Sequence, residues 1–294
     1  MALGATAYGL WGLFPLFWTL LGSAGALETL AHRMVWSLVV MVGVLWWLNR
    51  GTAFASVRAV LASRRKLGLL AIAAVLIAFN WGGYIWGVNH GRVVETALGY
   101  FTGPLVSVLM GVLLLGERLR VAQWVAVGLG AIAVVVLAVG YGQVPWVALV
   151  LAFSFSGYGL VKKLADVPAV ESVGIEAAIT LVPALAYICV LQANGSGTFV
   201  SLGAGHTLLL IGSGLVSTLP LLAFGGAAVR IPLSMIGLLQ YLAPVLQFVF
   251  GVLVFHERMP PERWLGFAIV WLGLVILTVD GMRASRPPRA FEPV

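Results

Sequence analysis

Long apolar runs constrain this chain more than any other feature of its sequence. Several uninterrupted stretches reach about twenty residues, the length that an α-helix needs to cross a hydrocarbon core of about 30 Å. Charged residues make up only 9% of the 294 positions, and the mean hydropathy is +1.06, whereas a soluble domain carries about 25% charged residues. The runs do not alternate as transmembrane β-strands do. The sequence therefore predicts an all-α integral membrane protein.

Ten transmembrane helices can be drawn along the chain, with short connections except at 49–66 and 193–205. The first contains Pro15 and Trp18 and has no Lys or Arg before it, so we interpret it as a retained span rather than a signal peptide. The first long connection includes AFASVRAVLAS, a candidate for a short amphipathic helix on the membrane surface. The predicted spans are 3–21, 29–48, 67–89, 93–115, 121–140, 144–163, 173–192, 206–227, 231–255 and 264–281.

The distribution of Lys and Arg predicts the orientation of the spans, because cytoplasmic loops are enriched in these residues. With both termini in the cytoplasm, only Arg33, Arg92, Arg258 and Arg263 lie toward the outer side. The other basic residues, including those of a basic tail at 283–294, then lie on the inner side. These inner residues are Arg50, Arg58, Arg64, Arg65, Lys66, Arg118, Arg120, Lys162, Lys163, Arg230, Arg283, Arg286 and Arg289.

The two halves of the sequence resemble each other. Residues 97–124 align with residues 237–264, which carries the fourth span onto the ninth and leaves five spans in each half. Because five is odd, the halves insert with opposite orientations, an architecture common among secondary transporters. The sequence thus predicts two inverted five-helix repeats, at 1–140 and 141–282. The aligned pairs include Leu98/Leu238, Pro104/Pro244, Gly111/Gly251, Glu117/Glu257, Arg118/Arg258 and Trp124/Trp264.

Polar and aromatic residues follow single faces of several predicted spans, at about 100° per residue. Polar side chains that face lipid cost free energy, so these faces are expected to point inward, as packing contacts or as a cavity lining. Asn80 and Tyr84 fit both roles equally, whereas Gln240 and Gln247 favour a cavity because bulky amides pack poorly. The candidate solute-binding residues are Trp11, Arg33, Asn80, Trp81, Tyr84, Tyr100, Gln240, Tyr241 and Gln247.

Charged residues near the span ends allow two interpretations. Arg33 could snorkel to the interface or contact a carboxylate at the mouth of a cavity, and the adjacent His32 belongs to the residue type that titrates near neutral pH. Glu95 and Glu176 are the acids nearest to the spans, but neither is clearly mid-membrane, so a carboxylate proton relay is not favoured. Glu117 precedes an Arg in a turn and is interpreted as structural.

Catalytic and metal-binding motifs are absent from the sequence. It contains no Walker loop, GxSxG elbow, HExxH or EF-hand pattern. The histidines never pair at metal-ligand spacing, and the single cysteine, Cys189, excludes an intramolecular disulfide. The net charge of +7 is concentrated in loops and does not indicate nucleic-acid binding. We therefore expect no enzymatic activity, no cofactor and no metal.

Long segments of the chain resemble one known family. YGLWGLFPLFWTLL, LAHRMVWS, NWGGYIWGVNHGRVVETALGYFTGPLVSVLMGVLLLGERLR, PWVALVLAFSFSGYGLVKK and RIPLSMIGLLQYLAPVLQFVFGVLVFHERM are similar to the RarD group of EamA-type drug/metabolite transporters. The resemblance covers nearly the whole chain in order. It implies two five-helix EamA repeats, a bacterial inner membrane location and alternating-access transport, without specifying the solute.

The sequence thus favours a secondary transporter of a small metabolite or drug-like solute, acting as a monomer or homodimer among membrane lipids. Asn80, Trp81 and Tyr84 are expected to line a central cavity, with 89–92 as its outer collar. Arg33 would favour a carboxylate on a solute with an apolar or aromatic part. The alternative is a lipid or polyprenyl-phosphate flippase or scramblase, which would have a lipid-open groove. A membrane-embedded enzyme, which would release an altered product, is a third interpretation.

Overall fold

Helices account for all regular secondary structure in the part of the chain that the computed structural model describes. The described residues are 1–49, 53–90, 92–141, 145–254, 268–269, 271–273, 275–276 and 279–280. The helices are α1 (Ala2–Gly12), α2 (Phe14–Trp18), the 3₁₀ helix η1 (Thr19–Leu21), α3 (Ala26–Asn49), α4 (Ala53–Ala62), α5 (Arg64–Asn89), α6 (Val93–Leu115), α7 (Val121–Tyr141), α8 (Trp146–Ala165), α9 (Ala169–Ala193), α10 (Ala204–Ala228), α11 (Leu233–Leu239) and α12 (Leu242–Leu253).

Six of the described helices are long and apolar enough to cross a membrane, namely α3, α5, α6, α8, α9 and α10. Each matches one predicted span to within about five residues at either end. The first predicted span is divided into α1, α2 and η1, and Pro15 lies in the first turn of α2 just after the break. The ninth is divided into α11 and α12 at Gln240. Pro244 lies four residues later and has no N–H group, so it cannot donate the helical hydrogen bond to the Gln240 carbonyl. Half of the tenth span, together with Glu257 and the tail, lies outside the described residues.

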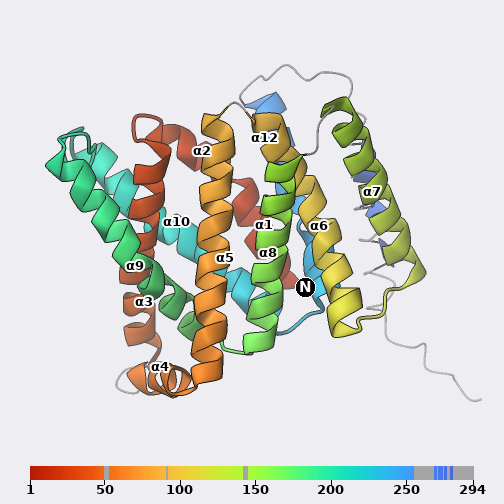
Figure 1. Ribbon diagram of the computed structural model, residues 1–294, viewed down its shortest axis with the longest axis horizontal. Coiled ribbons are helices and arrows are strands. Elements are labelled where there is room, and N and C mark those ends of the chain that lie inside the picture. The colour runs from red at the N-terminus through yellow and green to blue at the C-terminus, as the bar shows by residue number, and fades with distance from the viewer. Residues whose placement is uncertain are drawn as a thin grey trace, which may run out of the picture.

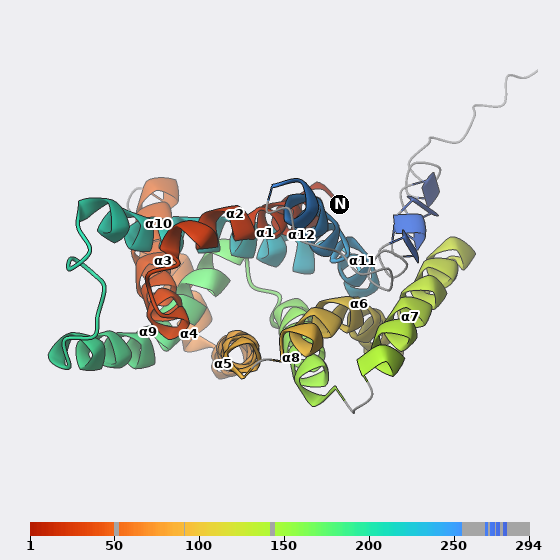
Figure 2. The same ribbon diagram turned by 90° about the horizontal axis from the view of Figure 1, so that it is seen from above.

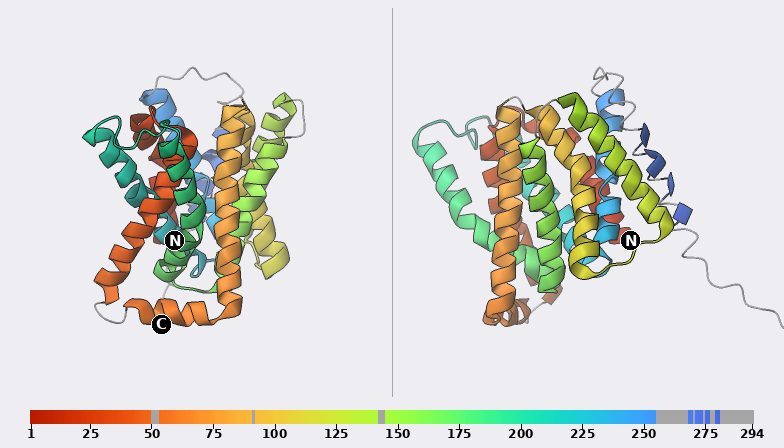
Figure 3. Two further views of the ribbon diagram at one scale, coloured as in Figure 1. Left: turned by 60° about the vertical axis from the view of Figure 1, so that its left-hand side comes forward. Right: turned by 45° about the vertical axis from the view of Figure 1, so that its right-hand side comes forward.

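The long helices run side by side, and the short helix α4 lies across the ends of α3 and α5 (Figures 1 and 3). We call this end of the bundle the α4 end. The helix predicted in the first long connection is therefore present as α4. Seen from above, α5 lies between α9 and α8 (Figure 2), and it packs against both. Helix α9 packs mainly on α3 and α10, whereas α8 packs mainly on α5 and α6.

The centre of the bundle is filled by aromatic side chains from α1, α8 and α10. Tyr8, Tyr158 and Phe224 are fully buried. The ring of Tyr158 stacks on that of Phe224, with centroids 5.4 Å apart, and the ring of Trp11 lies 5.7 Å from that of Phe155. We call these five residues the aromatic core. Burial of such large side chains supplies much of the contact between the two halves of the chain.

Candidate solute-binding site

Arg33 on α3 lies between aromatic rings from two other helices. The centre of its guanidinium group is 4.6 Å from the ring of Trp18 on α2 and 4.5 Å from the ring of Trp81 on α5. The ring of Phe14 lies farther away, at 5.8 Å. The Nε–H group donates a hydrogen bond of 2.8 Å to the Ser217 hydroxyl on α10. Four helices therefore converge on this one cation.

The charge of Arg33 has no acidic partner among the described residues. Aromatic faces attract a cation through the ring quadrupole, an effect of about 0.5–2 kcal/mol per ring. They do not neutralise it, and a cation removed from water without a counter-charge is costly. The planar guanidinium matches a carboxylate through two parallel hydrogen bonds. The arrangement around Arg33 can therefore receive an anion between aromatic faces.

Tyr84 and Tyr100 extend the same group of side chains toward solvent or lipid. Their rings are 5.9 Å apart, and the two residues are 39% and 41% exposed. Tyr100 is close enough to Arg33 for the two side chains to interact electrostatically. The structure thus brings together four of the residues predicted from sequence. We call the full group the Arg33 cluster; it consists of Phe14, Trp18, Arg33, Trp81, Tyr84, Tyr100 and Ser217.

Asn80 uses its amide to join α5 to α8. Its Nδ2 group donates hydrogen bonds to the Leu151 carbonyl at 2.8 Å and to the Ser154 hydroxyl at 2.9 Å. Both donor hydrogens are used, so only the amide oxygen is left for a solute. The structure therefore gives Asn80 a clear packing contact, and a cavity-lining role for it stays a prediction.

Trp11 and Gln247 lie together, and both Trp11 and Trp81 pack against the same hydrophobic core. Gln247 Nε2 on α12 donates a hydrogen bond of 3.2 Å to the Trp11 carbonyl. The Trp11 ring packs into the aromatic core, 5.3 Å from Tyr8 and 5.7 Å from Phe224. These contacts tie α12 to α1, and solute contact by either residue remains a prediction.

Gln240 and Tyr241 lie at the break between α11 and α12 and face α6. Both are buried, and the Tyr241 hydroxyl donates to the Phe101 carbonyl at 3.5 Å. A Cβ atom at Gly103 would lie 2.7 Å from the Gln240 amide nitrogen, so α6 approaches this side chain closely. The Gln240 amide oxygen has no hydrogen-bond partner within the described part of the chain. A buried unpaired acceptor of this kind is uncommon.

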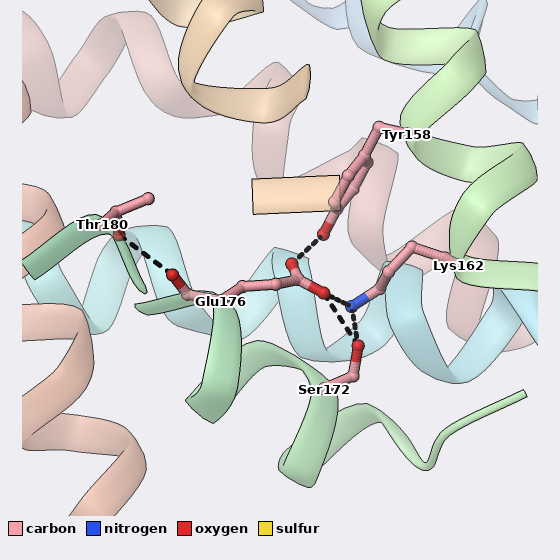
Figure 4. Close-up of polar contacts among 5 residues, drawn as sticks. All are labelled: Tyr158, Lys162, Ser172, Glu176 and Thr180. Carbon is pink, nitrogen blue, oxygen red and sulfur yellow. Dashed lines mark hydrogen bonds and ion pairs between the residues drawn. The ribbon is translucent and has the colours of Figure 1, made fainter. Parts of the chain in front are cut away.

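A second polar group lies at the α4 end, and the contact between its members was not predicted from the sequence. Lys162 and Tyr158 on α8 meet Glu176 and Ser172 on α9, and all four side chains are buried (Figure 4). Tyr158 and Lys162 are four residues apart, as are Ser172 and Glu176, so each pair occupies one helix face. This four-residue spacing on both sides of a short turn is the sequence feature from which the contact could have been predicted. We call these four residues the Glu176 network.

The residues of the predicted outer collar surround the start of α8. His90 stacks on the Trp86 ring with centroids 4.1 Å apart, and its Nδ1 lies 2.8 Å from the Trp86 carbonyl oxygen. The Arg92 guanidinium lies 5.3 Å from the Trp146 ring. The side chain of Asn89 is outside the described residues. Aromatic stacking and cation–π contacts therefore hold this end of α5 against α8.

Comparison with known proteins identifies the family. The model of the EamA-like transporter family matches residues 1–139 and 144–279. The chain belongs to this family. The RarD protein of Streptomyces exfoliatus is 58% identical over 287 residues, which cover 98% of this chain and 90% of the relative. The RarD protein of Escherichia coli strain K12 is 37% identical over 284 residues, covering 97% and 95%. The chain is thus a RarD-type member of the EamA family.

Two further similarities concern name and fold. A Pseudomonas aeruginosa relative named chloramphenicol-sensitive protein RarD is 30% identical over 271 residues, covering 91% of this chain and 89% of the relative. One solved crystal structure has a TM-score of 0.73 and covers 97% of this chain and 98% of its own, at 20% identity. At that identity the match shows a shared fold. Membership of the EamA family places this multi-pass membrane protein among transporters of the drug/metabolite type.

Proposed function

We propose that this EamA protein is a secondary transporter that moves a small carboxylate-bearing metabolite or drug-like solute across the bacterial inner membrane by alternating access. The observation that carries the proposal is the guanidinium of Arg33, which lies between two indole rings without an acidic partner in the described structure. A carboxylate would accept its remaining N–H groups. The faces of Trp18 and Trp81 would bind an apolar or aromatic part of the solute.

Alternating access by two inverted repeats is supported by the packing of the helices. Helix α8 packs on α5 and α6, and α1 packs correspondingly on α10 and on α11–α12. A two-fold exchange of α1 with α8, α5 with α10, and α6 with α11–α12 would produce this pairing. The two segments that match the family model, 1–139 and 144–279, divide the chain at the same place. Rocking of such repeats about a central site is a common transport mechanism.

The charge distribution supports a cytoplasmic α4 end. Most basic residues of the described helices lie in α4 or at the ends of the long helices next to it, whereas Arg33 and Arg92 lie toward the opposite end. Basic residues are enriched on the cytoplasmic side of membrane proteins. The residues at the α4 end are Arg58, Arg64, Arg65, Lys66, Arg118, Arg120, Lys162, Lys163 and Arg230.

The side chains along the bundle fit a state that is closed at the α4 end. Tyr84 and Tyr100 of the Arg33 cluster are exposed, whereas Tyr8 and Phe224 of the aromatic core are fully buried. Beyond the aromatic core, the Glu176 network joins α8 to α9. A solute bound at Arg33 would therefore exchange with the outer side and be separated from the cytoplasm by these two layers.

A thermal-stability screen of the detergent-purified protein tests the proposal. Amino acids, aromatic carboxylic acids, the primary amides of those acids and amphenicols are compared, because a ligand that binds the folded state raises Tm. We expect a carboxylate to raise Tm and its amide to have little effect. Arg33→Ala should abolish the response, and Arg33→Lys should weaken it because lysine lacks the planar fork.

Asn80→Ala and Gln247→Ala are screened in parallel, because both were predicted to contact the solute. A full response from these variants would limit the site to the Arg33 cluster. Equal stabilisation of the wild type by acid and amide would contradict a carboxylate-binding role for Arg33. Stabilisation by specific phospholipids, with no response to any soluble solute, would favour the flippase alternative and lead to assays of lipid movement.

A further inference from the structure

Two helices that barely contact each other along their backbones are joined by a buried ion pair. Helices α8 and α9 follow each other across a short turn but share almost no backbone contact in the described structure, and α5 packs against both. Near the α4 end, Lys162 Nζ on α8 lies 2.7 Å from Glu176 Oε1 on α9. The two residues are 3% and 5% exposed. The pair therefore joins two consecutive helices close to the turn between them.

The carboxylate of Glu176 receives hydrogen bonds from three side chains (Figure 4). Lys162 and Ser172 donate to Oε1, and the Tyr158 hydroxyl donates to Oε2 at 3.0 Å. Lys162 also donates to the Ser172 hydroxyl. All these donors favour the ionised carboxylate. The closed arrangement thus depends on the negative charge of Glu176.

Packing alone does not explain this choice of residues. A buried ion pair recovers its desolvation cost only with good geometry, and well-packed apolar residues often replace one with no loss of stability. Ionisable residues inside membrane spans more often mark ion or proton pathways. Here the pair lies at the α4 end, the end that has to open in the proposed transport cycle.

The other elements packed against this part of α9 present apolar side chains. Met41 and Leu45 of α3 face Gly174, and Phe224 of α10 stacks on Tyr158. Helices α4 and α5 contribute Val60 and Leu70, which pack with Ile175. Within the described structure, Lys162 and Tyr158 are the titratable groups in contact with Glu176. A proton that enters this group therefore changes the net charge of an isolated site.

Helices α3 and α9, which correspond in the proposed repeats, carry opposite charges at similar distances from their first residues. Arg33 follows Ala26, the first residue of α3, by seven positions, and Glu176 follows Ala169, the first residue of α9, by the same number. Arg33 contacts rings of α2, and Glu176 contacts Lys162 and Tyr158 of α8. Arg33 has no acidic partner among the described residues, whereas Glu176, near the α4 end, pairs with Lys162.

We propose that Glu176 is a proton-binding site that controls the opening of the α4 end, an inference that rests on the proposed alternating-access function. Transfer of a proton from water to a Glu176 oxygen makes the carboxyl neutral and removes its attraction to Lys162. The ammonium group stays protonated and turns toward water at the nearby end of α8. Because the closed arrangement contains the Lys162–Glu176 ion pair and a proton on Glu176 removes it, acid is expected to shift the population toward the open state.

The test measures a distance between two labelled residues at the α4 end as the pH is changed, with no solute present. Spin labels are attached to the full-length protein through Arg58→Cys on α4 and Arg118→Cys after α6, both exposed, with Cys189→Ser to remove the native thiol. Pulsed electron paramagnetic resonance then gives the distance between the labels in lipid nanodiscs from about pH 5 to 9. We expect a longer distance to gain population as the pH falls.

Substitutions at Glu176 and Tyr158 identify the group responsible. Glu176→Gln should populate the longer distance at every pH. Tyr158→Phe keeps the ring but removes one donor to the carboxylate, so the transition should move to higher pH. Glu171→Gln, on the same helix without a contact to Lys162, is the matched control and should keep the wild-type response.

Two results would overturn the proposal: a wild-type distance that does not change with pH, or a wild-type response in Glu176→Gln. Because no solute is used, a failure here is distinguishable from a failure of the transporter proposal. A protein that binds carboxylates through Arg33 but shows no pH response would retain the function and lose the proton site.

Discussion

At the scale of single residues, Asn80 and Arg33 use their polar groups in different ways. The donor hydrogens of Asn80 are taken by Leu151 and Ser154, whereas the charge of Arg33 has no carboxylate partner in the described structure. Without ligand, Asn80→Ala should lower the stability by about 1–2 kcal/mol, because it removes the two hydrogen bonds that the side chain donates to α8. Arg33→Ala should cost less, since it also removes an uncompensated charge.

The measurement for this pair is thermal unfolding of the purified variants without added solute. A lower Tm for Asn80→Ala than for Arg33→Ala is the expected order. The reverse order would show that the rings around Arg33 stabilise the fold more than the amide bridge does, and it would weaken the assignment of Arg33 to a ligand.

The sequence identified the chemistry of these residues better than their partners. Trp81 was predicted as a candidate solute-binding residue, and the structure places it and Trp18 against the guanidinium of Arg33. The contact of Asn80 with α8 depends on the rotation of one helix against another, which periodicity does not determine. Four-residue spacings placed polar residues on one face of α8 and on one face of α9. Only the fold shows that these two faces meet at Glu176.

At the scale of helices, the close approach of α10 to α3 predicts a sharp difference between two glycines. A Cβ atom at Gly214 would lie 2.4 Å from the backbone carbon of Trp36, whereas one at Gly212 would have no atom within 4 Å. Gly214→Ala must push the helices apart, at a cost of about 1–3 kcal/mol. Gly212→Ala should be neutral or stabilising by up to about 1 kcal/mol, because alanine favours the helix.

Comparison of Tm for the two variants checks this prediction, because both substitutions add one methyl group to the same helix. Equal effects would mean that α10 does not approach α3 as closely as the structure indicates. The close contact could not be predicted from the sequence, because the chain contains many glycines and the sequence does not show which of them face a neighbouring backbone.

Helix ends were predicted with more success than helix contacts. The first and ninth spans were predicted as continuous helices, but both are broken close to a proline, Pro15 and Pro244 respectively. Glu117 was interpreted as a structural turn residue. Its carboxylate accepts hydrogen bonds from the backbone N–H groups of Leu233 at 2.7 Å and Ser234 at 2.8 Å, which fixes the start of α11. That long-range contact could not be deduced from the local Glu-Arg pattern.

At the scale of the whole molecule, apolar periodicity predicted the class of protein and most of its long helices, because each transmembrane helix must satisfy its own backbone. The arrangement of those helices depends on many side-chain contacts between distant segments. The separation of α8 from α9 by their different partners is one example. Because α8 and α9 share almost no backbone contact, the side chains of the Glu176 network join them near the α4 end.

Orientation is the remaining property of the whole molecule that charge alone predicts. In a Cys189→Ser background, Ser201→Cys lies exposed between α9 and α10, and Arg58→Cys lies exposed on α4. If the α4 end is cytoplasmic, a membrane-impermeant maleimide added to intact bacterial spheroplasts should label Ser201→Cys, and Arg58→Cys should react only after permeabilisation. The opposite pattern would place the basic end outside. The Arg33 cluster would then open toward the cytoplasm, and the Glu176 network would close the outer side.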